Sequence, residues 1–436
     1  MHDKKVRPRH FIGLIIAFFS GLTASVLASE SLRPDALVAL AIENNPDLLL
    51  SRADLVSAKA AQSLTGVLQN PRVEFGLGRE SSQAILQDRS AQLQNLSLSQ
   101  FVENPALRES RIASARFLSQ AQAARLQWIR AQVAGLVRRS AYEVVLRQAE
   151  IKAADEARLL LESTRARVKL RVESGDAARY ELIKAEAELI GAQQRTQVAR
   201  LALEQARIRL QQLLGVDLPT GWSINASLED PVDLPERDRM RMRFLKNHPD
   251  LLALGAEFNA ASERVNEARA SRWPGVDLQL SQLRDRGVDR PNRYETVLGA
   301  TIAVPLLDPR KAAIDLAQSQ VQRASVALKT REQSLLREFD SASAALEIAA
   351  LRVKSLDEGA VRQAEAALRV AEAAYRFGER GILDVIDAQR VLRQIRADLL
   401  SARFEQQAAA IALQVLSFDM NHGESSPAHP NQTRTK

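Results

Sequence analysis

Cysteine is absent from the 436 residues of this chain, and aromatic side chains are scarce. Without thiols the chain has no disulfide, no thiolate metal ligand and no cysteine nucleophile. Phe, Trp and Tyr make up 4% of the residues although 46% are hydrophobic, so aliphatic side chains supply most of the apolar surface. This composition favours long helices and coiled coils over a core of bulky side chains.

Long hydrophobic runs are also lacking, except near the N-terminus. There, a basic segment from Lys4 to Arg9 precedes the apolar run FIGLIIAFFSGLTASVL, and Val26 and Ala28 fit the small-residue positions of a cleavage site. We therefore expect a signal peptide at 1–28 and export of the chain. An uncleaved membrane anchor is the alternative. No later segment reaches the ~20 apolar residues of a transmembrane helix.

Signals for catalysis, metal binding and nucleic-acid binding are lacking as well. The 60 Lys and Arg are interspersed with 53 Asp and Glu, which is typical of solvated helix faces. No nucleophile motif, phosphate-binding loop or pair of catalytic carboxylates is present, and His248, His422 and His429 do not have the spacing of metal ligands. We expect no enzyme activity, no cofactor, no metal site and no nucleic-acid partner.

The chain does contain an internal repeat. NNPDLLL at 44–50 is matched by NHPDLLA at 247–253, with an offset of 249 − 46 = 203 between the prolines. The same offset recurs at two further pairs, Pro71 with Pro274 and Gly175 with Gly378. Self-similarity at a fixed period indicates tandem duplication.

We therefore expect two similar structural units, at 29–218 and 237–418. Each unit consists of a helix, a β-hairpin and a long helical hairpin. The segment 219–236 is rich in Gly, Pro and Asp and is predicted to link the two units. The polar tail at 419–436 is expected to be disordered.

The two β-hairpins are predicted at 72–102 and 275–306. In segments such as RVEFGLG and VDLQLS, apolar and polar residues alternate, which indicates strands with one apolar face. The last strand is predicted to extend through Val304. Polar loops are predicted between the paired strands, at 79–91 and 284–293.

The long helices are predicted to begin at Pro105 and Pro309, because proline is favoured in the first helical turn. In the second half, one uninterrupted helix from Pro309 to Phe377 would be ~100 Å long at ~1.5 Å per residue. Its coiled-coil seam consists of apolar residues seven positions apart: Ile314, Val321, Leu328, Leu335, Ala342, Ala349 and Leu356. Gly378 then fits a left-handed position after the helix end, and Gly381 is expected to free the backbone for the turn into a return helix.

Four strands with an apolar face cannot span a membrane alone, because open sheet edges are not tolerated in lipid. Strands from several chains can close a barrel, with the apolar faces toward the lipid and the polar faces toward a lumen. The long helices would then project from this barrel as a second, helical tube.

Several motifs resemble the outer-membrane efflux (TolC-like) family. They are the NPDL segment, the helix entries SQFVENPALRESR and VPLLDPRKAAI, and the tip YRFGERGILDVIDAQRVL. The resemblance covers about 34–418, and it is strongest to the heavy-metal efflux branch. It implies a fold that is mainly α with membrane β: a homotrimer whose outer-membrane β-barrel, with four strands per chain, continues into a long periplasmic α-helical coiled-coil barrel.

The resemblance also implies a function. The protein would be a passive exit duct for heavy-metal cations in the outer membrane of a Gram-negative bacterium. Its partners would be a periplasmic adaptor protein and an inner-membrane pump of the RND type. A duct of a multidrug efflux or type I secretion system is the alternative. A periplasmic adaptor or scaffold is a remoter one, which the presence of two helical hairpins in equal repeats disfavours.

By the same resemblance, Arg380, Asp384 and Asp387 form the gate of the duct. The two aspartates are three residues apart and so share a helix face, and three copies would form acidic rings that attract cations. The alternative is that these acids only complement the helix dipole; Glu181 and Lys184 occupy the matching places in the first half. The tip residues expected to contact the adaptor are Gly175, Asp176, Gly378 and Gly381.

Overall fold

The computed structural model describes residues 31–84, 87–219, 221–232, 240–241, 244, 247–287 and 291–418. The expected signal peptide at 1–28 and the expected tail at 419–436 lie outside the described residues, as do parts of the predicted linker at 219–236. No helix in the described part of the chain is long and apolar enough to cross a membrane.

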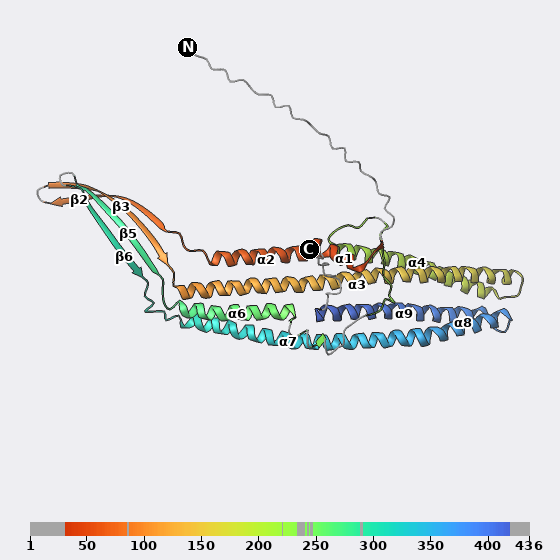
Figure 1. Ribbon diagram of the computed structural model, residues 1–436. Coiled ribbons are helices and arrows are strands. Elements are labelled where there is room, and N and C mark those ends of the chain that lie inside the picture. Colours follow the sequence, from red (N-terminus) through yellow and green to blue (C-terminus); the bar gives the residue numbers. More distant parts are fainter. Residues whose placement is uncertain are drawn as a thin grey trace, which may run out of the picture.

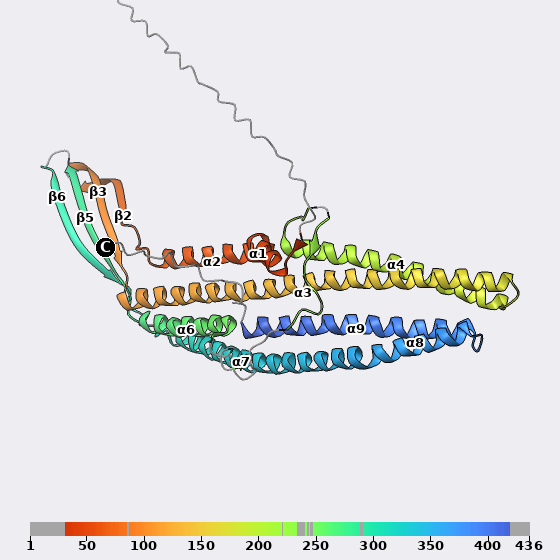
Figure 2. The same ribbon diagram turned by 45° about the vertical axis from the view of Figure 1, so that its right-hand side comes forward.

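The described chain forms a long rod with a β-sheet at one end and two helical turns at the other (Figure 1). Figures 1 and 2 both show α2 and α4 lying end to end along α3, and α6 and α9 lying end to end along α7 and α8. The helices are α1 (Pro34–Asn44), α2 (Pro46–Thr65), α3 (Pro105–Glu173), α4 (Arg179–Leu214), α6 (Pro249–Ala270), α7 (Lys311–Lys354), α8 (Val361–Arg376) and α9 (Ile382–Ser417).

The two long helical segments begin differently. α3 begins at Pro105 as predicted, and the Asn104 side chain caps it by accepting a hydrogen bond from the Ala106 N–H at 3.0 Å. The prediction for the second half is wrong by two residues, because α7 begins at Lys311. Arg310 precedes it in a left-handed conformation with φ 60°, so the helix cannot extend back to the proline.

The predicted uninterrupted helix of the second half is also wrong, because residues Ser355–Ala360 form a π-helical segment between α7 and α8. A π-helical turn adds a residue and so shifts the phase of the apolar stripe. The predicted seam is buried or half-buried up to Leu356. Beyond the π-helical segment, Ala364 is buried and Ala367 is exposed.

The four long strands form one antiparallel sheet in the order β2-β3-β5-β6. They are β2 (Arg72–Ala84), β3 (Gln87–Val102), β5 (Val276–Gly287) and β6 (Arg293–Ile302), and β3 pairs with β5 to join the two hairpins. The strands extend into the predicted loops at 79–91 and 284–293, and β6 ends before Val304. Backbone pairing depends on the register with the partner strand and continues where the side chains become polar.

One face of this sheet is apolar and exposed. Large side chains on it include Val73, Phe75, Leu77, Leu96, Leu98, Leu278, Leu280 and Leu298. The opposite face carries polar residues such as Glu74, Asn95 and Gln279. β2 and β6 are the edges of the sheet, and among the described residues neither has a further strand partner.

The main apolar core lies near the middle of the rod, where α1, α3 and α4 meet. Its buried residues include Leu37, Val137, Val144 and Leu210, and Trp222 from the segment between the two halves packs against them. The short parallel pair β1 (Ser31–Leu32) and β4 (Ser223–Ile224) ties the start of the described chain to the same segment. These contacts hold α1, α3 and α4 together near the middle of the rod.

Alanine at Gly135 tests how tightly α3 packs against α9. A Cβ there would clash with Val415 Cγ2 on α9, and valine cannot easily rotate away. We expect Gly135→Ala to lower the free energy of unfolding by about 1–3 kcal/mol. The control is Gly255→Ala, where a Cβ meets no atom within 4 Å, and which should be neutral or stabilising by about 0.5–1 kcal/mol. Equal melting temperatures for the two variants would contradict this packing.

Candidate functional site at the helical tips

The first tip joins α3 to α4 through a glycine in the left-handed region. Gly175 has φ 84°, and the N–H of Asp176 donates to the Arg171 carbonyl at 2.8 Å. The N–H of Gly175 donates to the Val172 carbonyl at 3.2 Å. These two bonds form a Schellman motif, which satisfies the last carbonyls of α3.

The second tip joins α8 to α9 with the same motif. Gly378 has φ 75°, as expected, and the N–H of Glu379 donates to the Ala374 carbonyl at 2.9 Å. The expectation for Gly381 is wrong, because its φ of −76° and ψ of 163° are extended values that any residue adopts. The turn therefore depends on Gly378, and Gly381 only precedes the first residue of α9.

The two tips pack against each other. Behind them lies a buried cluster from three helices: Val168, Ala185, Ile382, Val385 and Ile386. At its edge, the Arg171 guanidinium of the first hairpin lies 4.9 Å from the ring centre of Tyr375 in the second, a cation–π distance. The two hairpins thus end as one unit.

Asp384 and Asp387 lie on the face of α9 that points away from this cluster. Their side chains are 44% and 66% exposed. Arg380 donates to the Asp384 carboxylate at 3.2 Å within the same chain, and Arg390 lies 3.0 Å from the Asp387 carboxylate. The structure therefore brings Arg380 to Asp384 and leaves both carboxylates accessible.

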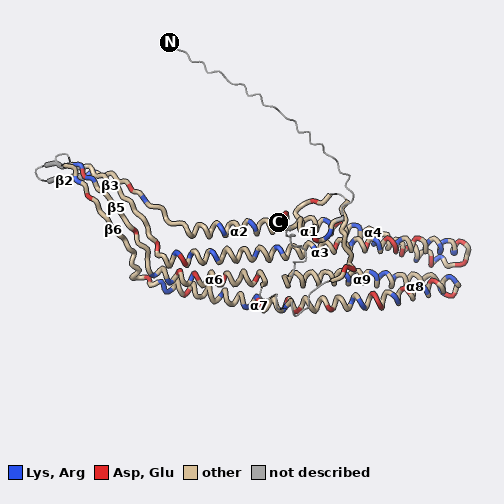
Figure 3. The backbone as a smooth tube through the Cα atoms, viewed as in Figure 1, with Lys and Arg blue, Asp and Glu red and all other residues tan. Residues whose placement is uncertain are grey.

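Arg390 also links the two hairpins, which the sequence did not indicate. Its guanidinium lies 3.5 Å from Glu188 on α4, and these two residues are 202 positions apart. No local pattern predicts a contact at that separation. Figure 3 shows that residues of both charge signs gather at the tips, so the carboxylates of α9 lie among basic side chains.

A small pocket of about 120 Å³ lies behind the tips, between α3, α8 and α9. Gln389 and Arg393 line it. Burial, together with the nearby Arg195, lowers the pKa of Arg393. The Gln389 side chain is buried, and its amide has no hydrogen-bond partner among the described residues. Buried polar groups without partners destabilise a contact, so the hairpins are less firmly joined here than at the apolar cluster.

His248 is a second residue whose environment the sequence did not reveal. It caps α6, where its Nδ1 accepts the Asp250 N–H at 3.2 Å. The residue is 1% exposed, and its ring centre lies 4.6 Å from that of Trp128 and 5.2 Å from that of Phe244. Burial lowers its pKa to about 4. Among the described residues no group of three or more His, Cys, Asp and Glu is placed to hold a metal ion.

Comparison with known proteins shows which proteins this chain is similar to. Residues 242–417 match the family described as outer membrane efflux protein. Over this segment the chain is similar to the outer membrane efflux proteins. The cobalt-zinc-cadmium resistance protein CzcC of Cupriavidus metallidurans is 24% identical over 386 residues, which is 88% of this chain and 90% of that protein.

Two further efflux relatives extend the likeness over both halves of the chain. The pyoverdine export outer membrane protein OpmQ of Pseudomonas putida is 25% identical over 87% of this chain and 84% of its own. A crystal structure of CusC matches with a TM-score of 0.74 and 19% identity, over 89% of this chain and 92% of that one. At that identity the CusC likeness is one of fold. CzcC is named as a resistance protein and OpmQ as an export protein.

Proposed function

We propose that three copies of this chain form an exit duct through the outer membrane. The observation that carries the proposal is the sheet: it exposes a row of apolar side chains and has two open edges at the end of a helical rod. An exposed apolar sheet face of this kind is suited to lipid, and pairing β6 of one copy with β2 of the next removes every edge. Three copies give twelve strands.

A stripe along α4 supports the same assembly. Exposed apolar side chains recur on it at helical spacing: Ile183, Ile190, Val198, Leu201 and Ile208. Such a stripe is typical of a coiled-coil seam that lacks its partner helix. In the trimer, this seam packs against a helix of the neighbouring copy and closes a periplasmic helical tube.

The exported substrate is proposed to be a heavy-metal cation, and the driving force to come from an inner-membrane pump of the RND type through a periplasmic adaptor. The resistance protein CzcC, matched over most of the chain, supports this choice. OpmQ, named for pyoverdine export, favours a second candidate, the efflux of small organic molecules. The tips around Gly175, Asp176, Gly378 and Gly381 are the proposed adaptor contacts.

The aperture is proposed to lie at the second tip. In a trimer the exposed Asp384 and Asp387 of each copy form two rings around the opening, and rings of carboxylates favour cations. Arg380 and Arg390 hold these carboxylates in place at 3.2 Å and 3.0 Å. Opening requires α8 and α9 to move relative to α3 and α4. The contact at Gln389 is weak, so separating the hairpins there requires the least free energy.

Deleting the gene tests the function. Growth inhibition is measured across divalent metals, drugs and detergents, with the wild-type gene restored as a control. Sensitivity confined to metals is expected. Sensitivity to drugs and detergents instead would move the substrate to organic molecules, and the absence of any sensitivity together with recovery in the inner-membrane fraction would contradict the duct itself.

Removing the two aspartates tests the aperture. We expect Asp384→Asn with Asp387→Asn to lower the cation-to-anion permeability ratio of the reconstituted channel severalfold, because the rings lose their charge. The measurement is the reversal potential in a salt gradient. Glu181→Gln is the control, since it removes the matching first-turn acid of α4. An equal change in both proteins would indicate a helix-dipole effect instead.

A further inference from the structure

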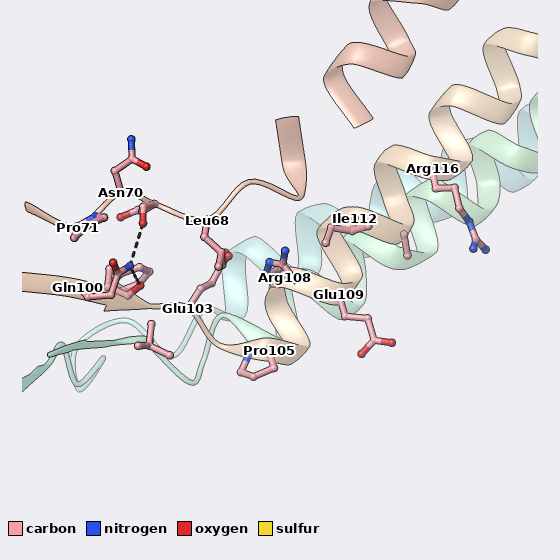
Figure 4. Close-up of a pocket in the computed structure, with 14 residues that line it drawn as sticks. Leu68, Asn70, Pro71, Gln100, Glu103, Pro105, Arg108, Glu109, Ile112 and Arg116 are labelled. Atoms are coloured by element: carbon pink, nitrogen blue, oxygen red, sulfur yellow. Dashed lines mark hydrogen bonds between the residues drawn. The ribbon is translucent and has the colours of Figure 1, made fainter. Parts of the chain in front are cut away.

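An open pocket of about 1020 Å³ lies at the junction of helices and sheet. Figure 4 shows the segment with Leu68 and Pro71 on one side of it and the first turns of α3 on the other. Its apolar lining includes Leu68, Pro71, Phe101, Val102, Pro105 and Ile112. The volume is at the upper end of the range for ligand pockets, so it accommodates several side chains rather than one.

The walls of this pocket are held in place by hydrogen bonds. Gln100 Nε2 donates to the Gln69 carbonyl at 3.0 Å, as the dashed line in Figure 4 shows. Arg108 donates to the Gly66 carbonyl at 2.5 Å, beyond the end of α2. The segment from α2 to β2 is therefore fixed against β3 and α3, and the pocket is a defined feature.

The second half has an equivalent helix-to-strand connection, and there the space is already filled by another part of the same chain. The connection from β3 to α3 packs against the connection from α6 to β5, where Asn104 Nδ2 donates to the carbonyls of Ala270 at 3.0 Å and Trp273 at 2.8 Å. The fit is close, because a Cβ on Gly275 would collide with Phe101 and lie 2.7 Å from the Val102 carbonyl oxygen. A strand-to-helix connection of the first half thus covers a helix-to-strand connection of the second.

The corresponding connection of the second half covers no such segment among the residues that the structure describes. It follows β6 and contains Leu306, 84% exposed, and Leu307, 100% exposed. In the repeat, Asp308 takes the place of Asn104, and the Asp308 carboxylate accepts the Arg310 N–H at 2.9 Å just before α7. Two adjacent leucines are thus left exposed at the helix–sheet junction.

Strand order decides which surface these leucines meet. The sheet is antiparallel throughout, so β2 begins and β6 ends at the same end of the sheet, next to the helices. We propose that Leu306 and Leu307 of one copy occupy the pocket at Leu68–Pro71 of the next copy, sealing the junction between barrel and helical tube. This inference rests on the proposed trimer, in which β6 of one copy pairs with β2 of the next.

Both surfaces carry charges of both signs. The pocket is also lined by two acids and two bases, Glu103, Glu109, Arg108 and Arg116. The incoming segment carries Asp308 and Arg310, one of each sign. Opposite charges can therefore pair at the rim while the leucines fill the apolar part.

Engineered cysteines test the contact, since the chain has none of its own. Leu68→Cys is combined with Leu307→Cys in the full-length protein, and outer-membrane vesicles are oxidised and analysed without reductant. We expect covalent trimers, because each copy would be joined to the next. The control pair is Val56→Cys with Leu307→Cys, since Val56 is also exposed but lies within α2, well before its end, whereas Leu68 follows that end. Each single-cysteine protein shows whether the substitutions are tolerated.

The outcomes separate this inference from the proposed function. Covalent trimers from the Leu68 pair alone support it. A native trimer on unheated gels with no cross-link, or equal cross-linking of both pairs, overturns the inference and leaves the duct intact. No trimer from the wild type contradicts the duct. A fluorescent label on Leu307→Cys that only a lipid-soluble quencher reaches would place the leucines in lipid and also overturn the inference.

Discussion

Alanine at Gly215 is expected to lower the free energy of unfolding by about 2–5 kcal/mol. Gly215 ends α4 with φ 73°, where a side chain is strained. A Cβ would also collide with the Asn44 carbonyl oxygen and lie 2.9 Å from the Asn44 carbonyl carbon and 3.3 Å from Pro46 Cδ. Because backbone atoms cannot rotate away, the chain at the α1–α2 junction has to shift.

Gly221→Ala is the matched control for this prediction. Gly221 has a similar φ of 86°, but a Cβ there meets no atom within 4 Å. It should therefore lose only the ~1–2 kcal/mol of the left-handed conformation. The measurement is the unfolding transition of each purified protein in detergent. If both variants unfold at the same point, the close approach of Gly215 to the α1–α2 junction is not a feature of the folded protein.

Acid is expected to destabilise the protein through His248. The unfolded-state pKa is near 6.5 and burial lowers the folded-state pKa to about 4, so the unfolded chain binds the proton more readily. The contribution to stability is fully present above pH 6.5 and is lost as the pH falls toward 4. At 1.36 kcal/mol per pKa unit, the free energy of unfolding falls by about 3 kcal/mol. Asp250 and Glu338 oppose this lowering of the pKa, and Arg331 adds to it.

The control for this pH dependence is His248→Asn. The repeat mate Asn45 shows that an asparagine can cap the helix at this position, since its side chain accepts the N–H of Asp47 at 3.0 Å. Unfolding midpoints of both proteins are measured from pH 7.5 to pH 4. The wild type should lose about 3 kcal/mol more than the variant over this range. Parallel curves would mean that the histidine is not the group that titrates.

The sequence by itself determined the local features of this protein. Pro105 and Asn104 start α3, and Gly378 takes the left-handed conformation at the second tip, as expected. The strands follow the alternation of apolar and polar residues. These features depend on residues within a few positions of each other, so the sequence pattern carries them. The spacing of Asp384 and Asp387 likewise predicted that they share one helix face.

Only the tertiary structure decided which distant segments meet. It joined the two hairpins through β3 and β5, interrupted the predicted long helix at Ser355–Ala360, buried His248, and brought Arg390 to Glu188. Each of these depends on packing between elements far apart in the chain, where the fit of side chains and the register of backbone hydrogen bonds override local preference. Spacing therefore predicted that the two aspartates share a helix face, and the family resemblance suggested their place at the proposed aperture. The arginine and glutamate that connect them to the other hairpin were set by the fold.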